Sequence, residues 1–453
     1  MNNRIHEILN EKAKYFTDIS DYIWDNPELS YREFKSAKAL KDAIVDLGFE
    51  LVENLAGIET AFKGVYGSGH PVIGFMGEFD ALAGLSQVAE CTTETAINPG
   101  QPGHGCGHNS LGSACLAAAY AIKKVMEENN LPGTIIFYGC PAEEQGCGKS
   151  FMAREGVFNE LDVAIAPHPG DANGITGFSA LANIQAEFKF KGKASHAAAV
   201  PHLGRSALDA CSLMIVGVQF LREHVIQEAR IHHAYTNTGG TSPNVVQADA
   251  SLLFYIRAPK SQQVRDMFAR MQNIAQGAAL MTDTTMEFAV KSGMTELVPN
   301  DVLGKVMEES FAEIGHINFS DEAMAVAKKM AVAVPGCDPE NPLVDNIPTY
   351  KRVDMAMPGS TDVGDVSYVV PTVMVTYTSY VKGTPGHSWQ QVAQTRSAII
   401  HEGMIHNAKV MALAAYKLLT NTDLVAAAKK EFDDAGIKYE CLIPADVQPE
   451  PQA

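Results

Sequence analysis

Cysteine, histidine and carboxylate side chains of the kinds that bind transition metals lie in a few short polar strings of the chain. Cys106 and His108 are two residues apart in Gly103-His104-Gly105-Cys106-Gly107-His108-Asn109, where glycines allow turns that can aim both side chains at one point. Two ligands do not make a metal site, so further donors must come from elsewhere. The full set of candidates is Cys106, His108, Glu144, His168 and His387. Thiolate, imidazole and carboxylate together suit Zn²⁺, Mn²⁺ or Co²⁺ better than Ca²⁺ or Mg²⁺.

Two adjacent carboxylates, Glu143 and Glu144, follow an apolar segment in the string Pro141-Ala142-Glu143-Glu144. Such a pair is either a solvated turn or a general base beside a metal ligand. A second chemistry also fits these strings, because Cys106 could act as a nucleophile with a histidine as its base. The candidate bases for that reaction are His104, His108 and His168. In that mechanism the two glutamates would have no role.

The segments before these strings have the residue pattern of a parallel α/β sheet. Short and almost wholly apolar runs, typical of buried strands, alternate with helical stretches such as Leu111–Asn129. The predicted strands are Val72–Met76, Thr134–Tyr138 and Val163–Ala166. Ligands bind at the carboxyl ends of the strands in such sheets. We therefore expect Glu78, Asp80, the glutamate pair and His168 to meet at one edge.

A different residue pattern begins near residue 182. Asn183–Lys191 alternates apolar and polar residues, as a half-exposed antiparallel strand does. The segments after it suggest the order β-α-β-β-α-β of a small ferredoxin-like α+β domain, with a helix at Ser206–Glu223, strands within Val245–Ala258, a helix at Gln263–Leu280 and a strand at Thr285–Ser292. The pattern of the first part resumes after Pro299, and the tail from Pro444 looks frayed.

These patterns together predict an α/β fold whose mainly parallel sheet has helices on both faces and is interrupted by a smaller α+β domain. The predicted boundaries assign residues 1–181 and 298–453 to the larger, metal-binding domain and residues 182–297 to the insert.

Composition narrows the class of protein. The chain has 453 residues, of which 46% are hydrophobic, and a formal net charge of −18. A chain of this kind folds into a globular core, and its charge disfavours nucleic acid and anionic membrane surfaces as partners. No secretory signal or apolar run long enough for a membrane span is visible, and eight scattered cysteines suggest reduced thiols. We expect a cytoplasmic protein.

Several strings together resemble the dinuclear metallo-amidohydrolases and metallopeptidases related to aminoacylase and carboxypeptidase G. They are Gly77-Glu78-Phe79-Asp80-Ala81-Leu82, His104-Gly105-Cys106-Gly107-His108-Asn109, Tyr138-Gly139-Cys140-Pro141-Ala142-Glu143-Glu144, Gly192-Lys193-Ala194-Ser195-His196-Ala197-Ala198 and Gly239-Gly240-Thr241-Ser242-Pro243-Asn244. Within that family the chain looks most similar to the branch of the p-aminobenzoyl-glutamate hydrolase subunit designated B and its dipeptidase relatives. The likeness extends over nearly the whole chain.

The resemblance implies hydrolysis of an amide or peptide bond in a small N-acyl-amino acid, p-aminobenzoyl-glutamate-like or dipeptide substrate. It implies two divalent ions per subunit, zinc or manganese, held by the five ligands named above, with Glu143 as general base and Asp80 as an orienting group. It also implies that the insert is a lid through which a homodimer forms, leaving open a hetero-oligomer. His196 would reach the partner subunit's active site, while Asn244 and Arg257 would hold a substrate carboxylate.

Two departures from the family pattern support an alternative, a catalytically degenerate member that acts as a scaffold or partner subunit. Glu78 stands where many members carry a histidine ligand, and it remains an alternative ligand. Asn109 stands where the auxin-conjugate hydrolase branch carries an aspartate. In Gly359–Asp365, which resembles a substrate-side loop, we interpret Asp362 and Asp365 as ordinary turn residues.

Overall fold

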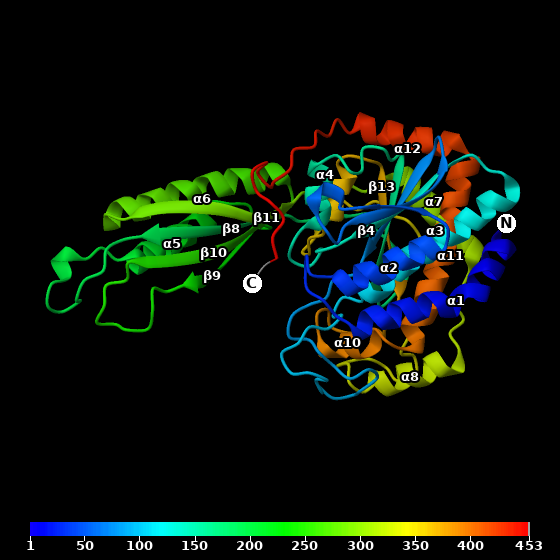
Figure 1. The fold of residues 1–453 in the computed structure, drawn as a ribbon, viewed down its shortest axis with the longest axis horizontal. Helices are drawn as coiled ribbons and strands as arrows, with labels where there is room; N and C mark the ends of the chain where they lie inside the picture. Colours follow the sequence, from blue (N-terminus) through cyan, green and yellow to red (C-terminus); the bar gives the residue numbers. More distant parts are fainter. Residues whose placement is uncertain (452–453) are drawn as a thin grey trace.

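The computed structural model describes residues 1–451 and shows two bodies of different size joined side by side (Figure 1). Each body has its own sheet and its own apolar core. The larger body contains both the first part of the chain and the part that follows β11 (Thr285–Met294). The smaller body is formed by the middle of the chain, which is drawn in green in Figure 1.

The larger sheet has seven strands in the order β1-β2-β4-β3-β5-β13-β6. Its four central strands, β4, β3, β5 and β13, are mutually parallel, and the remaining strands are antiparallel to their neighbours. The strands are β1 (Glu50–Glu53), β2 (Phe62–Ser68), β3 (Val72–Glu78), β4 (Gly133–Cys140), β5 (Val163–Gly170), β6 (Gly174–Ile175) and β13 (Thr372–Thr378). A small two-stranded sheet pairs β7 (Ser179–Ala180) with β12 (Ala356–Met357). The predicted mainly parallel sheet is confirmed.

Both faces of the larger sheet are buried, as the continuous apolar runs predict. Along β4, Ile135 and Phe137 belong to one apolar cluster, whereas Ile136 and Tyr138 belong to another on the opposite face. The first face is covered by α1 (Asn2–Asp25), α2 (Phe34–Asp46), α3 (His108–Asn129), α7 (Asp301–Ile314) and α11 (Ala398–Thr420). The second face is covered by α4 (Gly148–Arg154), α9 (Val363–Ser367) and part of the C-terminal segment. The outer helices are α8 (Asp321–Ala331), α10 (Trp389–Gln394) and α12 (Thr422–Asp434).

The smaller body has an antiparallel sheet of order β11-β8-β10-β9 with two helices packed on it. Its elements are β8 (Ala182–Lys191), α5 (Ala207–Arg222), β9 (Arg230–Asn237), β10 (Asp249–Ala258), α6 (Ser261–Thr282) and β11. This is the predicted order β-α-β-β-α-β. The sequence pattern did not predict β9, and it placed the start of the next strand too early. Most of β9 is exposed because it lies at the sheet edge, so it lacks the alternation on which the prediction depended.

The tail is ordered where the sequence suggested fraying, so that prediction is wrong for residues up to Val447. Arg154 donates to the backbone oxygens of Pro444 and Val447 at 2.8 and 2.9 Å. Just before them, Leu442 is buried in the core of the smaller body and Ile443 in a core of the larger one. The last two residues of the predicted frayed tail, 452 and 453, lie outside the described residues.

Among residues 1–451, none of the helices combines the length and the apolar character needed to cross a membrane. All eight cysteines are free thiols, as the scattered spacing predicted.

Candidate metal-binding active site

The carboxyl ends of the central parallel strands bring the predicted chemical residues to one edge of the larger sheet. β3 ends at Glu78, β4 ends two residues before Ala142, and β5 carries His168 near its end. Because these strands are parallel, their ends face the same side, as the sequence patterns predicted. The loop before α3 supplies the cysteine, and α3 begins at His108 rather than at Leu111.

The first ligand group consists of Cys106, His108 and His168, whose donor atoms all lie within 4.8 Å of one another. The Sγ atom of Cys106 is 3.2 Å from Nε2 of His168. On the other side of the same ring, Nδ1 of His168 is 2.7 Å from the Pro169 carbonyl oxygen, to which it donates when it carries the proton. That hydrogen bond leaves the Nε2 lone pair directed at the thiol.

Gly107 makes the approach of the two chain segments possible. Its φ of +81° lies in the left-handed region, and a β-carbon there would meet the Pro169 ring at 3.0 Å. A side chain at this position would therefore push the Cys106 loop away from the strand that carries His168.

The second ligand group consists of Cys106, Glu144 and His387, again with donor atoms within 4.8 Å of one another. His387 comes from the loop after β13, and its backbone N–H donates to the Gly105 carbonyl at 3.2 Å and to the Gln391 side chain at 2.9 Å. Its Nε2 atom is 3.5 Å from a carboxylate oxygen of Glu144. Cys106 is therefore common to these two groups, and a third group, Glu78, His108 and Glu143, does not include it.

The turn that carries the two glutamates is held in an unusual backbone conformation. Ala142 has a φ of +63°, which is uncommon for a residue with a β-carbon. The buried Glu33 carboxylate accepts the Ala142 N–H at 2.9 Å, and Asp80 accepts the N–H of Glu144 at 2.9 Å. These contacts fix where Glu143 and Glu144 lie relative to the strand ends.

Asp80 also holds His108. Its Oδ1 atom is 2.9 Å from Nδ1 of the buried His108 ring, which leaves Nε2 facing the ligand groups. Burial opposes ionisation of this carboxyl, but its hydrogen bond with His108 holds its pKa below the usual value. An ionised Asp80 is the expected partner for a histidine that must present one lone pair to a metal.

Three buried polar atoms at this edge make no hydrogen bond: Oε2 of Glu78 and Nε2 of His108, which lie 3.3 Å apart, and Oε1 of Glu144. Such orphaned atoms are rare in folded proteins and call for an ion or water. Their chemistry, together with a thiol and two more imidazoles, fits divalent cations of borderline softness. The residues present are therefore compatible with a two-metal site.

Burial dominates the electrostatics of the two glutamates. It raises the pKa of Glu144 to about 7, and it raises the pKa of Glu143 well above its usual range, with Glu78, Asp362 and Glu144 adding repulsion. Burial and the Glu144 charge raise the pKa of the Cys106 thiol to about 12. Without added positive charge, the edge thus favours protonated carboxyl and thiol groups.

A buried charged network behind Glu143 was not predicted from the sequence. The Lys149 side chain is fully buried, and its Nζ atom is 2.7 Å from Glu78 and 2.5 Å from Asp362. Asp362 also accepts the backbone N–H of Lys149. A lone lysine at the start of a short helix carried no signal of this role, because helix-start lysines are usually solvated.

The interpretation of Asp362 and Asp365 as turn residues is wrong, since both are fully buried. Asp365 accepts hydrogen bonds from Ser150 Oγ, the Thr295 N–H and Tyr439 Oη at 2.8 to 2.9 Å. The two aspartates therefore anchor α9 and its first turn on the second face of the sheet. Their aspartate-glycine spacing is shared with solvated turns, so sequence alone could not separate the two cases.

Both bodies contribute to a cavity of about 450 Å³ that opens onto Cys106, Glu143, Glu144, His168 and His387. Arg257 of β10 lines the opposite side, with its guanidinium 4.6 Å from the centre of the Tyr255 ring. Among residues 1–451 the guanidinium has no ion-pair partner. Its charge is free for a ligand.

His196 and Asn244 do not line this cavity. They are adjacent on the smaller body, where the Ala197 N–H donates to the Asn244 carbonyl and Nδ1 of His196 accepts from Ala198 and Ala199. Both residues are exposed. Within one chain, neither takes part in the site formed by Cys106 and its neighbours.

The structure explains why asparagine, and not aspartate, stands at position 109. Its amide nitrogen donates to Ser20 Oγ and to the Thr395 carbonyl at 3.0 and 2.8 Å, so Asn109 ties the start of α3 to α1 and to the segment before α11. This role needs a donor, which an aspartate would lack.

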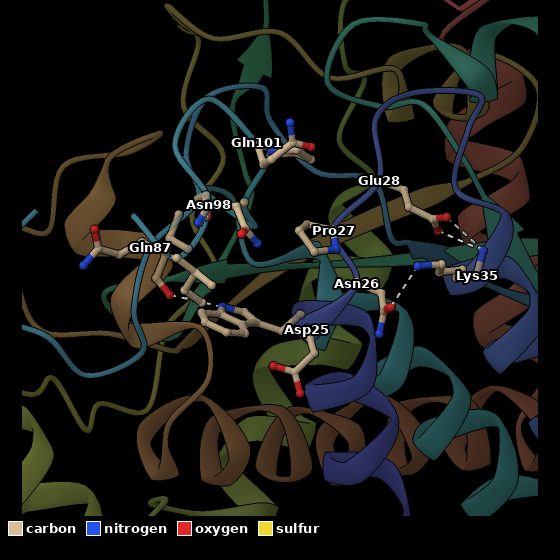
Figure 2. A pocket seen from close by; sticks show the side chains of 14 residues that line it. Asp25, Asn26, Pro27, Glu28, Lys35, Gln87, Asn98 and Gln101 are labelled. Atoms are coloured by element: carbon tan, nitrogen blue, oxygen red, sulfur yellow. Dashed lines mark hydrogen bonds between the residues drawn. The ribbon is translucent and has the colours of Figure 1, made fainter. Parts of the chain in front are cut away.

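A second cavity, of about 340 Å³, lies between the end of α1 and the loop around Gln87 and Asn98 (Figure 2). Its charged groups are already paired, because Glu28 accepts the Lys35 backbone N–H and the Lys35 ammonium donates to Asn26. None of the ligand groups found among residues 1–451 includes a residue of this cavity. The chemistry is concentrated in the cavity at the strand ends.

The fold and the site define a metal-dependent hydrolase, and comparison with known proteins agrees. Residues 74–444 match peptidase family M20/M25/M40. The p-aminobenzoyl-glutamate hydrolase subunit designated B, from Escherichia coli strain K12, is 42% identical, over 99% of this chain and 98% of that protein. The Xaa-Arg dipeptidase of Mus musculus is 27% identical, over 95% of this chain and 92% of that protein.

A solved structure of similar fold is a dinuclear metal-binding peptidase of the M20 family from Bacillus subtilis. It superposes with a TM-score of 0.61 over 91% of this chain and 99% of that chain, at 17% identity. The chain belongs to peptidase family M20/M25/M40. It is a hydrolase of amide or peptide bonds, as its sequence motifs indicated.

Proposed function

We propose that this protein hydrolyses the amide or peptide bond that joins an acyl or aminoacyl group to an amino acid with a free carboxylate. The observation that carries the proposal is the pair of ligand groups that share Cys106 at the wall of a cavity, with Arg257 on the opposite side. The names of the relatives agree with it, since one hydrolyses p-aminobenzoyl-glutamate and the other is a dipeptidase.

In this proposal two divalent ions, zinc or manganese, are held by Cys106, His108, Glu144, His168 and His387. The two groups of donors and their orphaned buried atoms support it. Such ions would lower the pKa of a water molecule and polarise the amide carbonyl. Asp80 would orient His108, as its 2.9 Å contact suggests.

Glu143 is the proposed general base. Its carboxylate would take the proton from the attacking water and return it to the leaving amine. In the free protein, burial and nearby carboxylates raise its pKa well above the usual range. In these surroundings the Glu143 carboxyl is ionised at neutral pH only when positive charge is nearby. Glu143 would therefore act as a base only when metal ions are bound.

Arg257 is proposed to hold the substrate carboxylate, for which a guanidinium is the best-matched side chain. Asn244 and His196 would serve the active site of a partner subunit, and the smaller body would act as lid and dimerisation domain. Their exposed position away from the cavity of their own chain is consistent with this. A homodimer is the simplest assembly, and a hetero-oligomer is the second, because one relative is named as a subunit.

We further propose that the domain boundaries lie at 181/182 and 297/298 and that the protein is cytoplasmic. The change from β7, which pairs with β12 of the larger body, to β8, which belongs to the sheet of the smaller body, supports the first boundary. The free state of all eight cysteines supports a reducing compartment.

The test is a screen for amine release from N-acyl-amino acids, p-aminobenzoyl-glutamate and dipeptides, with Zn²⁺, Mn²⁺ or no added metal. The metal content of the purified protein is measured alongside. Activity that a chelator abolishes and one of these ions restores, with close to two metals per chain, supports the proposal. A folded, metal-loaded protein that cleaves none of these substrates would contradict the proposal. A protein that binds no metal would favour the scaffold alternative.

One contact favours a second mechanism, the 3.2 Å distance between Cys106 Sγ and His168 Nε2. A cysteine nucleophile needs a thiolate, however, and burial raises the pKa of Cys106 to about 12. Burial and the neighbouring His108 also lower the pKa of His168, which weakens it as a base. An enzyme indifferent to chelators and inactivated by iodoacetamide would establish this alternative.

A further inference from the structure

Asn183 is the least explained polar side chain in the wall of the active-site cavity. It lines the cavity and is only 1% exposed, yet neither its Oδ1 nor its Nδ2 atom has a hydrogen-bond partner. A buried amide with both ends unpaired is rare in a folded protein. Because this unpaired amide also lines the cavity, it points to a ligand that supplies both a donor and an acceptor.

The position of Asn183 relates it directly to Arg257. In the sheet of the smaller body, Asn183 of β8 is in register with Arg257 of β10 on one side and with Met294 of β11 on the other. Side chains directly opposite each other on neighbouring strands project from the same face of a sheet. All three residues line the cavity, so one row across the sheet presents a cation, an amide and an apolar side chain.

We propose that Asn183 is a specificity-determining residue that recognises, together with Arg257, the amino-acid half of the substrate. This inference rests on the proposed function and refines its substrate class. The Nδ2 group donates to the carboxylate that Arg257 holds, and Oδ1 accepts the N–H of the scissile amide. The favoured substrates are N-acyl amino acids with a free α-carboxylate and a secondary amide.

The chemistry of this substrate class matches the side chain. In an N-acyl amino acid the amide N–H and the carboxylate are attached to the same carbon, so a single primary amide can span both. Neighbouring lining groups such as Phe178, Met294 and Leu297 are apolar and cannot replace it. A buried side chain that hydrogen-bonds the substrate discriminates strongly between substrates. An analogue that lacks the matching group leaves the amide of Asn183 without a hydrogen-bond partner.

The test compares three probes: p-aminobenzoyl-glutamate, its α-carboxamide and its N-methylated amide. Values of kcat/KM are measured on the metal-loaded wild type, on Asn183→Asp and on the near-isosteric Asn183→Leu. Asn183→Asp places a negative charge beside the carboxylate, so the preference for carboxylate over carboxamide should fall by about a hundredfold or more. In Asn183→Leu both this preference and the penalty for N-methylation should fall by about tenfold.

Asn407→Leu is the matched control. Asn407 is equally buried, and both of its amide atoms are also unpartnered, but it lies on α11 and does not line the cavity. It should leave the ratios between the probes unchanged. Ratios that change by less than about twofold in both folded Asn183 variants would overturn the inference, since a merely structural role does not alter discrimination between probes.

A parallel measurement separates this inference from the proposed function. Binding of the same probes is measured by calorimetry in the Glu143→Gln background, with and without the Asn183 substitution. If the wild type hydrolyses none of the substrates in the amine-release screen, the proposed function fails, and the binding ratios of the three probes still decide the role of Asn183. Lost discrimination in binding supports it, and unchanged discrimination overturns it.

Discussion

The two walls of the active-site cavity are constructed differently. The wall from the larger body carries titratable side chains such as Cys106, Glu143 and Glu144. The charged groups behind it, Asp80, His108 and Lys149, are each held by at least two contacts to neighbouring groups. The wall from the smaller body carries one cation, Arg257, and one unpaired amide, Asn183, among apolar side chains. Hydrogen bonds and ion pairs fix the first wall before a substrate arrives. The second wall still has free hydrogen-bond donors and acceptors.

This contrast separates two tasks. Residues that must hold metals and move protons need positions set to within a fraction of an ångström, which a network of buried hydrogen bonds provides. Residues that select a substrate need free donors and acceptors that the correct substrate completes. If this division is correct, substitutions in the first wall should affect folding or the rate of reaction, and those in the second should affect discrimination.

The largest expected effect is on stability, at Lys149 behind the first wall. Lys149→Met leaves the buried Glu78 and Asp362 carboxylates without their cation, so the free energy of unfolding should fall by about 3–5 kcal/mol. Chemical denaturation of wild type and variant measures this difference. The exposed Lys38, paired with Asp42, is the control, and Lys38→Met should change stability by less than about 1 kcal/mol. Equal effects of the two substitutions would show that the buried Lys149 network does not hold the first wall in place.

The next effect concerns the reaction itself. Glu143→Gln keeps the size and burial of the side chain but cannot accept a proton, so kcat should fall by about a hundredfold or more while metal content is retained. Steady-state kinetics and metal analysis together test this. Turnover near the wild-type value in a variant with full metal content would remove Glu143 from the role of base.

A smaller effect is expected at Arg257 in the second wall. Arg257→Met removes the free cation, so KM for a substrate with a carboxylate should rise by about ten- to a hundredfold, with a lesser change in kcat. The carboxamide analogue of the same substrate should be affected little. If both substrates suffer equally, Arg257 serves the fold and not substrate selection.

The smallest effect is a pH dependence of stability from Asp365, which anchors the first wall from behind. Burial raises the pKa of Asp365 to about 6, so the folded state binds a proton more tightly than the unfolded state does. Stability from this group is therefore complete at pH values below about 4 and is lost as the pH rises through about 6.

Asp365→Asn cannot ionise and should gain stability relative to wild type by on the order of 1–2 kcal/mol between about pH 4 and pH 7. Denaturant unfolding of both proteins across this range measures the difference. A constant gap between them would show that the carboxyl of Asp365 is ionised throughout.

Much of the fold could be predicted because strand and helix periodicity is a local property. The apolar runs ending near Met76, Tyr138 and Ala166 predicted the central parallel strands, although each strand extends further. The extra residues include the polar Glu78 and His168 and several glycines and prolines, which fall outside a pattern of large apolar side chains. The exposed edge strand β9 was missed for the same reason.

The partnership between distant residues could not be predicted in this way. Glu78 was expected at the strand-end edge, but its partners Lys149 and Asp362 are far from it in the chain, and each looks like a solvated charge until the fold buries all three together. Asn183 is a similar case, because an asparagine at the start of a strand shows its unpaired amide only when its neighbours are known.

By itself the sequence determined the class of chemistry, since Cys106, His108, Glu144, His168 and His387 are metal donors whatever their arrangement, and their motifs indicated the family. It also determined the order of the elements, because periodicity is set by neighbours along the chain. The tertiary structure decided which donors share Cys106, which charges are buried against one another and which polar groups remain free. Those properties depend on distances between segments far apart in sequence, which only the folded chain defines.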